Sequence, residues 1–287
     1  MPIEILEETP YSIKMRVSGY PLEVLNSIRR ASMEEVPKMA VDFVGIDRND
    51  SVMLNEILAH RLALIPLTSE EALFKYGSPE ECSRCTPEEA EADKCYTTDN
   101  KPCYVRLILD IKAETDNEIV YSGDLRSEDE DVKPVLSNIP IVTLLKDQSI
   151  RLVAYARLGR GKEHAKWMPA TVAIVKPILE GITYNEKLCN EKCQKECVEK
   201  CPYAFEFKNG RLVLKDNVSL SMLMYCIEYI CEGSSINPVF KNNEYYFELE
   251  VDGSLSPKKT LITSANTLIE KLNSIKSRLE EIGGVTK

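Results

Sequence analysis

One stretch between residues 26 and 67 decides the fold. It reads Asn26-Ser-Ile-Arg-Arg30, then Glu35-Val-Pro-Lys-Met-Ala40, and then Glu56-Ile-Leu-Ala-His-Arg-Leu-Ala-Leu-Ile-Pro-Leu67. A helix that carries two arginines has to end before Pro37, because proline cannot continue a helix. Residues 39–47 then read as a strand, and residues 53–65 repeat apolar side chains at helical spacing. The pattern is dense, yet it contains nothing typical of catalysis.

The segments outside this stretch predict further strands and turns. Apolar and polar residues alternate over 13–17, 104–113, 150–158 and 245–251, which is the pattern of half-buried strands. Pro21 suits the first turn of the arginine-bearing helix, where its missing N–H is not needed. Asn209-Gly210 is a typical hairpin turn between two short strands. Together these patterns indicate an α+β chain.

The last predicted helix carries a long apolar seam. Ser256 can cap this helix, with Pro257 at its first position. Apolar residues then follow at alternating spacings of four and three: Leu261, Ala265, Leu268, Leu272, Ile275, Leu279 and Ile282. A sustained period of 3.5 residues makes a straight seam, as in helices that pack on other helices. The seam can cover the chain's own sheet, a partner subunit, or both.

Composition excludes several classes of protein. The chain has 287 residues, of which 44% are hydrophobic and 29% charged, and its formal net charge is -10. An acidic chain without a basic stripe argues against a free-standing DNA-binding regulator. The N-terminus lacks the features of a signal peptide, and no apolar run approaches the ~20 residues of a spanning helix. We therefore expect a cytoplasmic protein without membrane contact.

Catalytic signatures are missing as well. The two histidines, His60 and His164, stand apart from any serine or cysteine pattern that would indicate a nucleophile. The stretch Gly159-Arg-Gly-Lys162 lacks the earlier glycine and the following Ser or Thr of a P-loop. We expect no catalytic residues in this chain.

The first of two cysteine clusters lies in an acidic, turn-rich segment. Its spacing is Cys82-x2-Cys85-x9-Cys95-x7-Cys103. A Cys-x2-Cys pair can present two thiolates to one metal, and two further thiolates would complete a tetrahedral zinc site. In a cytosolic protein metal binding is a better expectation than a disulfide framework. A redox-labile pair and four unligated thiols are the alternatives.

The second cluster resembles a ferredoxin motif with altered spacing. Its members are Cys189, Cys193, Cys197, Cys201, Cys226 and Cys231. Only the step from Cys197 to Cys201, followed by Pro202, keeps the spacing of the bacterial ferredoxin run. Cys201 could join Cys226 and Cys231 at one site, or Cys189, Cys193 and Cys197 could join one more thiolate. An iron–sulfur cluster (3Fe-4S or 4Fe-4S), a degenerate domain without a cluster, and zinc or disulfides are the three hypotheses.

These segments, taken in order, resemble one family. Residues 26–37, 39–46 and 56–67 are similar to the alpha-like assembly subunits of multisubunit DNA-directed RNA polymerases, most closely their archaeal, D-type branch. Residues 162–170 resemble the family's second signature, and residues 247–257 with the final helix resemble its closing strand and dimerisation helix. The family usually has glycine at the position of Ala63.

The resemblance implies an architecture. The α+β fold would have an alpha-like dimerisation domain from residues 1–48 and 236–287. An inserted mostly-β domain would cover 49–180, with its cysteine loop at 82–103. A ferredoxin-like insertion with an iron–sulfur cluster would cover 181–235.

The resemblance also implies partners and an interface. They are a small alpha-like subunit (L), a small zinc-bearing subunit (N) and the large catalytic subunits, with DNA contacted only through the complex. The expected assembly interface comprises Arg29, Arg30, Leu261, Leu268, Leu272, Ile275 and Leu279. The chain would then be a non-catalytic scaffold for transcription; the alternative is a ferredoxin-like iron–sulfur redox protein.

Overall fold

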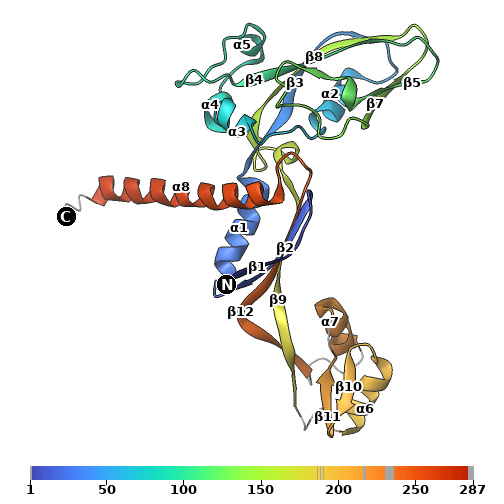
Figure 1. Cartoon of the computed structure of the whole chain (residues 1–287), viewed down its shortest axis with the longest axis vertical. Helices are drawn as coiled ribbons and strands as arrows, with labels where there is room; N and C mark the ends of the chain where they lie inside the picture. The colour runs from blue at the N-terminus through green and yellow to red at the C-terminus, as the bar shows by residue number, and fades with distance from the viewer. Residues whose placement is uncertain are drawn as a thin grey trace. The chain divides into compact units, whose positions relative to one another are not determined.

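The computed structural model describes residues 2–185, 187, 189, 191–215, 218–229 and 236–283 (Figure 1). The chain divides into two compact units. The smaller unit comprises Met1–Glu4, Arg16–Leu22 and Lys176–Tyr246, and the larger comprises Ile5–Met15, Glu23–Val175 and Phe247–Lys287. Each unit is therefore assembled from segments that lie far apart in the sequence.

The helices and strands follow the chain in a mixed order. Those of the larger unit are α1 (Leu22–Glu34, its first residue excepted), β3 (Pro37–Asn49), α2 (Asn55–Ala63), α3 (Ala72–Lys75), α4 (Pro79–Cys82), α5 (Pro87–Glu91), β4 (Tyr104–Lys112), β5 (Glu118–Tyr121), η1 (Ser122–Asp124), β6 (Arg126–Ser127), β7 (Pro140–Leu144), β8 (Ser149–Arg160), η2 (Ala165–Trp167) and α8 (Pro257–Gly283). Those of the smaller unit are α6 (Glu191–Lys200), β10 (Phe205–Lys208), β11 (Arg211–Leu214) and α7 (Leu220–Tyr229). Four strands contribute residues to both units: β1 (Ile3–Glu8), β2 (Ser12–Ser18), β9 (Ala170–Tyr184) and β12 (Ile236–Val251).

The main core of the larger unit lies on an antiparallel sheet of order β3-β8-β4-β6. Met39 pairs with Leu158 across β3 and β8, and Leu107 pairs with Ala154 across β4 and β8. All four side chains are buried, together with Leu58 and Leu62 from α2 and Leu67 after it. The signature at residues 56–67 therefore supplies the apolar face that closes this core. The mixture of helices and sheets confirms the predicted α+β class.

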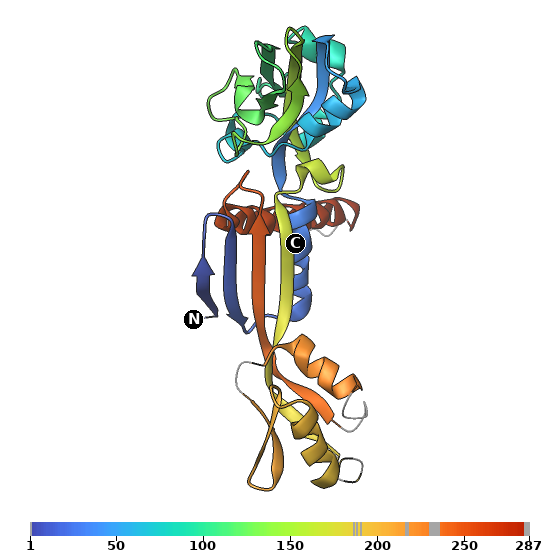
Figure 2. The same ribbon diagram turned by 90° about the vertical axis from the view of Figure 1, so that its right-hand side faces the viewer.

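A second four-stranded sheet has the order β1-β2-β12-β9, and Figure 2 shows its strands side by side. The predicted strand over 245–251 is the final part of β12. Sequence patterns did not predict β1, whose residues are all exposed. They also did not predict β9, which is only partly buried along both faces. Both therefore lack a clear contrast between apolar and polar positions.

The smaller unit is built around cysteines and one hairpin. Strands β10 and β11 pair with Phe205 opposite Leu214 and Lys208 opposite Arg211, so the turn falls on Asn209 and Gly210. Both turn residues have positive φ, as a two-residue hairpin turn requires. The described part of the unit's core consists of Cys189, Cys197, Cys201, Ala204, Phe205, Leu212, Leu223, Cys226, Ile227 and Ile236.

A buried aromatic group holds the end of β8 against η2. The Trp167 ring lies 4.4 Å from the guanidinium carbon of Arg157 and 4.1 Å from the Lys166 ammonium. Its Nε1 donates to the Arg157 carbonyl over 3.3 Å. The Asp42 carboxylate accepts from Arg157 and from Lys166, and Arg157 also forms an ion pair with Glu163, so two carboxylates balance the two cations. Gly159 lies directly beneath the ring.

None of the helices in the described ranges is long and apolar enough to span a membrane.

We expect Gly159→Ala to destabilise the larger unit, because the added Cβ would overlap the Trp167 ring. Overpacking of this kind costs about 1–3 kcal/mol, which denaturant unfolding of the full chain would measure. Gly181→Ala is the control, since no atom lies within 4 Å of a Cβ at that position. Equal unfolding midpoints for the two variants would contradict the close packing of Trp167 on β8.

Candidate assembly interface and cysteine sites

Helix α8 begins as its sequence predicts. Ser256 precedes the helix and its Oγ accepts from the Lys259 amide over 3.4 Å, while its carbonyl accepts from Thr260. Pro257 occupies the first helical position, where no N–H is required. The cap and the proline together fix where α8 starts, and the helix then continues to Gly283.

The two halves of α8 differ in burial. After the buried Pro257, the buried side chains of the first half are Thr260, Ser264 and Thr267, a stripe of small polar residues. Leu261 and Leu268 from the apolar seam are only half-buried there. The chain therefore covers α8 mainly through a stripe beside the predicted seam.

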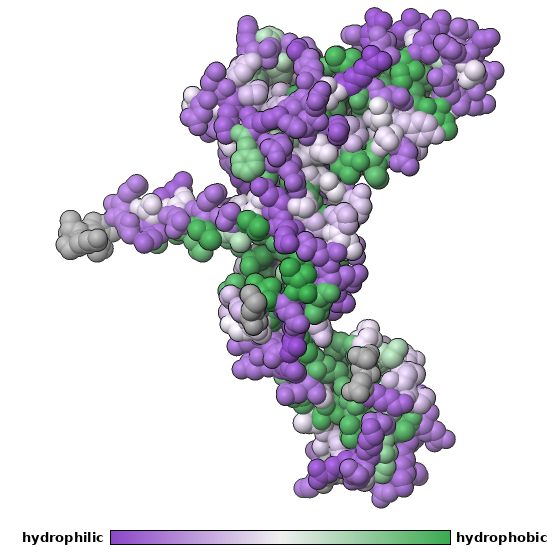
Figure 3. All heavy atoms as spheres, in the orientation of Figure 1, coloured by the Kyte–Doolittle hydropathy of each residue, from purple (hydrophilic) through white to green (hydrophobic). Residues whose placement is uncertain are grey.

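In the second half of α8 the seam is open to solvent. Every residue from 269 to 282 is exposed, and Leu272, Ile275 and Leu279 are 66%, 56% and 62% exposed. Figure 1 shows this half projecting from the rest of the larger unit, and in Figure 3 apolar surface is visible on the underside of the helix nearer its base, while the projecting end is mostly hydrophilic on the face shown. An apolar stripe of about three helical turns without cover is typical of a protein interaction site.

The arginines of α1 make contacts within their own helix. The Arg29 Nε donates to Asn26 Oδ1 over 2.8 Å, and Arg30 forms an ion pair with Glu34 at 3.5 Å. Arg29 is partly exposed, and the Arg30 side chain is 62% exposed. Both guanidiniums therefore remain accessible to a further acceptor.

Glu35, just after α1, anchors α8. Its carboxylate forms ion pairs with Lys271 on α8 and with Lys162 after β8. Burial by itself would raise the pKa of Glu35. The hydrogen bond from Lys271 and the charge of Lys162 outweigh that effect, so the pKa lies below its ordinary value. Sequence patterns predicted a role for neither lysine. The position of Lys271 directly beside the apolar seam is the sequence feature that could have identified it.

The structure brings the four predicted zinc ligands together in the larger unit. Cys82 is joined to Cys103, and Cys85 to Cys95, as disulfides. The expected zinc site requires four thiolates, whereas in this structure two crosslinks hold the polar loop that zinc was predicted to hold. Glu89 lies beside the second pair, and its carboxylate is within 4.8 Å of both sulfurs. The zinc site stays a prediction, since zinc requires the reduced thiolates.

Two groups of cysteines form in the smaller unit. The sulfurs of Cys189, Cys193 and Cys197 lie within 4.8 Å of one another, and Cys189 is joined to Cys193. Cys201 is joined to Cys226. The spacing of four residues between these cysteines would place all three on one face of a helix, but Cys189 precedes α6 and only Cys193 and Cys197 lie on it. Cys231 lies outside the described residues.

The hydroxyl of Tyr203 is the polar neighbour of the Cys201–Cys226 pair. It lies 3.6 Å from the sulfur of each cysteine. Sequence reasoning did not single out this tyrosine, although it directly follows the Cys-Pro step.

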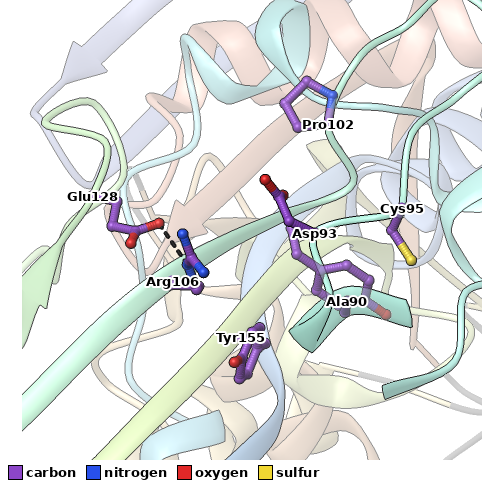
Figure 4. Close-up of a pocket in the computed structure, with 8 residues that line it drawn as sticks. Ala90, Asp93, Cys95, Pro102, Arg106, Glu128 and Tyr155 are labelled. Carbon is purple, nitrogen blue, oxygen red and sulfur yellow. Dashed lines mark hydrogen bonds and ion pairs between the residues drawn. The ribbon is translucent and has the colours of Figure 1, made fainter. Parts of the chain in front are cut away.

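Figure 4 shows a small hollow beside the cysteine loop, lined by side chains that include Asp93, Cys95 and Tyr155. Its volume is about 40 Å³, far below the size of a small-molecule site. Arg106 and Glu128 on its wall are paired with each other over 2.8 Å. The hollow has no nucleophile beside a free base, so it offers no catalytic arrangement.

The open helix face is typical of a protein that binds other proteins, and comparison with known proteins identifies the family. A model of the RNA polymerase Rpb3/RpoA insert domain matches residues 44–179. The chain is also similar over nearly its whole length to DNA-directed RNA polymerase subunit Rpo3 of Aeropyrum pernix, with 33% identity over 98% of this chain and 96% of the relative.

The same subunit of Methanothermobacter thermautotrophicus is 36% identical over 96% of this chain and 97% of the relative. That of Pyrobaculum islandicum is 49% identical over 58% of each chain. The chain therefore belongs to the Rpo3 family of DNA-directed RNA polymerase subunits.

We predict that carboxyl NMR titration will place the pKa of Glu35 below about 4.3, the ordinary value for glutamate. In Lys271→Ala the pKa should rise, because one stabilising cation is lost. A lowered folded-state pKa stabilises the protein above the unfolded-state pKa, and this contribution disappears as the pH falls through the folded-state pKa. The stability difference between wild type and Lys271→Ala, below about 1 kcal/mol, should therefore narrow in acid.

Lys276→Ala is the control for this titration, because Lys276 lies on the same helix and its contacts do not include Glu35. An unchanged Glu35 titration in Lys271→Ala would show that the anchor does not form in solution.

Proposed function

We propose that this chain is the archaeal, D-type member of the alpha-like family, the non-catalytic assembly subunit of DNA-dependent RNA polymerase. It would pair with the small alpha-like subunit (L) and bind the small zinc-bearing subunit (N). This platform would then receive the large catalytic subunits, and DNA would be contacted only through the complex. The protein would act in the cytoplasm, where transcription takes place in cells without a nucleus.

The observation that carries this proposal is the open half of α8. Burying a leucine or isoleucine side chain stabilises an interface by about 1.5–3 kcal/mol. The seam offers Leu272, Ile275, Leu279 and Ile282, each more than half exposed. A partner that covers them gains a binding energy of several kcal/mol from this helix alone. Membership of a polymerase subunit family supports a polymerase subunit as that partner.

The proposed interface also includes α1. Arg29 and Arg30 are the accessible cations of this helix, and a guanidinium can bind a partner carboxylate through two parallel hydrogen bonds. Leu261 and Leu268 would extend the apolar seam toward the capped end of α8, where each is still half open. The anchor between Glu35 and Lys271 joins the end of α1 to the helix that carries the seam.

We propose the same division into domains that the resemblance implies. A dimerisation domain of residues 1–48 and 236–287 would present α1 and α8. The inserted domain of residues 49–180 is supported by the family match over 44–179. The ferredoxin-like insertion would cover residues 181–235, which contain the second cysteine cluster.

We further propose that the second cluster of cysteines holds iron and sulfide. Three sulfurs within 4.8 Å of one another, in an apolar core, are a donor set that fits a 3Fe-4S or 4Fe-4S cluster once the thiols are reduced. Such a cluster would tie α6 to the chain before it, which is a structural role. A redox protein as the whole function is not proposed, because similarity to polymerase subunits extends across almost the entire chain.

In its reduced form the first cysteine cluster is a candidate zinc site, with Cys82, Cys85, Cys95 and Cys103 as its ligands. The four already share one small core with Ala90 and Tyr155, so their sulfurs are brought together by the fold itself. Zinc or the two disulfides would serve the same purpose there, since either fixes a polar loop with few apolar residues.

We expect the double variant Leu272→Ala and Leu279→Ala to lose pairing with the small alpha-like subunit. Both side chains are exposed in the single chain, so folding should be unaffected, while affinity should fall by about a hundredfold or more. Co-expression followed by size-exclusion chromatography measures the paired fraction. Leu54→Ala with Leu145→Ala is the matched control, because both leucines are exposed in the larger unit and lie outside α8. Pairing of the double variant at the level of this control would refute the proposal.

Metal analysis after anaerobic purification tests both cysteine clusters at once. We expect a brown protein that contains iron, with the iron and the visible absorbance lost in Cys197→Ser because that sulfur belongs to the close group of three. Cys82→Ser should keep the iron and lose zinc, so each variant is the control for the other. Colourless, iron-free wild-type protein would exclude the iron–sulfur proposal, and unchanged zinc content in Cys82→Ser would exclude the zinc proposal.

A further inference from the structure

The open seam on α8 has positively charged borders. In a heptad that places Leu272 and Leu279 at position a and Ile275 at position d, the flanking positions g and e are the ones that face a partner helix. Of the four such positions between residues 269 and 282, three are occupied by Lys271, Lys276 and Arg278, and the fourth by Ile269. The acidic residues of the same segment, Glu270, Glu280 and Glu281, fall at positions f, b and c on the far side of the helix.

This distribution does not reflect the composition of the chain. The formal net charge is -10. If charged residues were placed at random, carboxylates would therefore border the seam at least as often as cations. Lys271 is partly neutralised by Glu35. Among the ion pairs within the described ranges, none includes Lys276 or Arg278, and both residues are exposed. The border therefore presents positive charge to whatever covers the seam.

A second copy of this chain fits the border poorly. If two copies of α8 packed in parallel, Lys271 of one would face Lys276 of the other, because position g lies beside position e of the following heptad. If they packed antiparallel, g would face g and e would face e, again bringing cations together. Like charges across an interface oppose binding and act against the wrong partner.

Nucleic acid is a poor fit for a different reason. Phosphates bind cations but gain nothing from the leucine and isoleucine side chains between them. The seam leaves apolar groups more than half exposed along about three turns of helix, and only another apolar surface can remove these groups from water. The occupant therefore needs an apolar stripe with negative borders.

We propose that Lys271, Lys276 and Arg278 select a partner helix whose apolar stripe is bordered by Asp and Glu, and that they prevent this chain from pairing with itself. The identity of that partner as the small alpha-like subunit rests on the proposed function. The exclusion of a second copy does not depend on it. The apolar seam supplies the affinity of binding, and its charged border supplies the specificity for one partner.

The test uses the full chain with Lys276→Glu and Arg278→Glu combined. Its control is Lys94→Glu with Lys101→Glu, which makes the same change in net charge at two exposed lysines of the cysteine loop. Titration against the small alpha-like subunit at low ionic strength should show about a tenfold loss of affinity for the first variant, mainly through slower association. The loss should shrink at about 1 M salt, where charges are screened within about 3 Å.

A second measurement needs no partner subunit. Wild-type chain mixed with the Lys276→Glu and Arg278→Glu variant should form a mixed dimer in analytical ultracentrifugation, because opposite charges then border the two seams. Wild type alone should remain monomeric under the same conditions. Adding Leu279→Ala to the variant should weaken the mixed dimer, since that change removes part of the seam.

The outcomes separate the two proposals. If wild type does not bind the small subunit while the mixed dimer forms, the proposed function is wrong and the inferred role of the charged border is supported. If wild type pairs with itself as readily as with the variant, or if the variant binds the small subunit as tightly as its control, the inference is wrong. Binding of a labelled oligonucleotide that is lost in the variant and kept in the control would assign the border to nucleic acid and would also overturn it.

Discussion

A helix with an uncovered apolar face places the main constraint on this chain. Exposed leucine and isoleucine side chains cost free energy in water, and a domain can avoid that cost only by folding over them or by binding another surface. The chain covers the first half of α8 through Thr260, Ser264 and Thr267, and leaves the second half open. Two stripes of α8 therefore have different roles: one packs against the rest of the chain, and the other is available to a partner.

The cap at Ser256 and the ion pair between Glu35 and Lys271 keep the open half of α8 in place. Without such fixed points, a projecting helix would have to be ordered when the partner binds, and the cost in conformational entropy would reduce affinity. The network extends further into the larger unit. Arg160 donates to the Glu35 carbonyl and pairs with Glu80, in the segment that carries the first cysteine cluster. The seam is thus presented by a preformed support.

Much of the fold follows from local sequence rules, and particular residues show why. Strand β4 alternates clearly between buried and more exposed positions, and β8 does so from Ser149 to Ala154. The proline and glycine signals at Pro37, Pro257 and Asn209-Gly210 mark real boundaries. Strands β1 and β9 escape the same rules because neither has one strongly buried face. The pairing of Glu35 with Lys271 joins residues far apart in the sequence, so only the folded chain could reveal it. The partition of the cysteines into Cys189, Cys193 and Cys197 on one side and Cys201 with Cys226 on the other also depends on where α7 packs.

The open stripe also has a consequence for the cell that makes this protein. A copy produced in excess of its partner subunit exposes an apolar surface in a crowded solution, where it can bind other exposed apolar segments. Synthesis of the two components at matched levels, or rapid removal of the surplus, would keep such orphans scarce. The feature that permits assembly thereby makes the dosage of the subunit a quantity that the cell has to control.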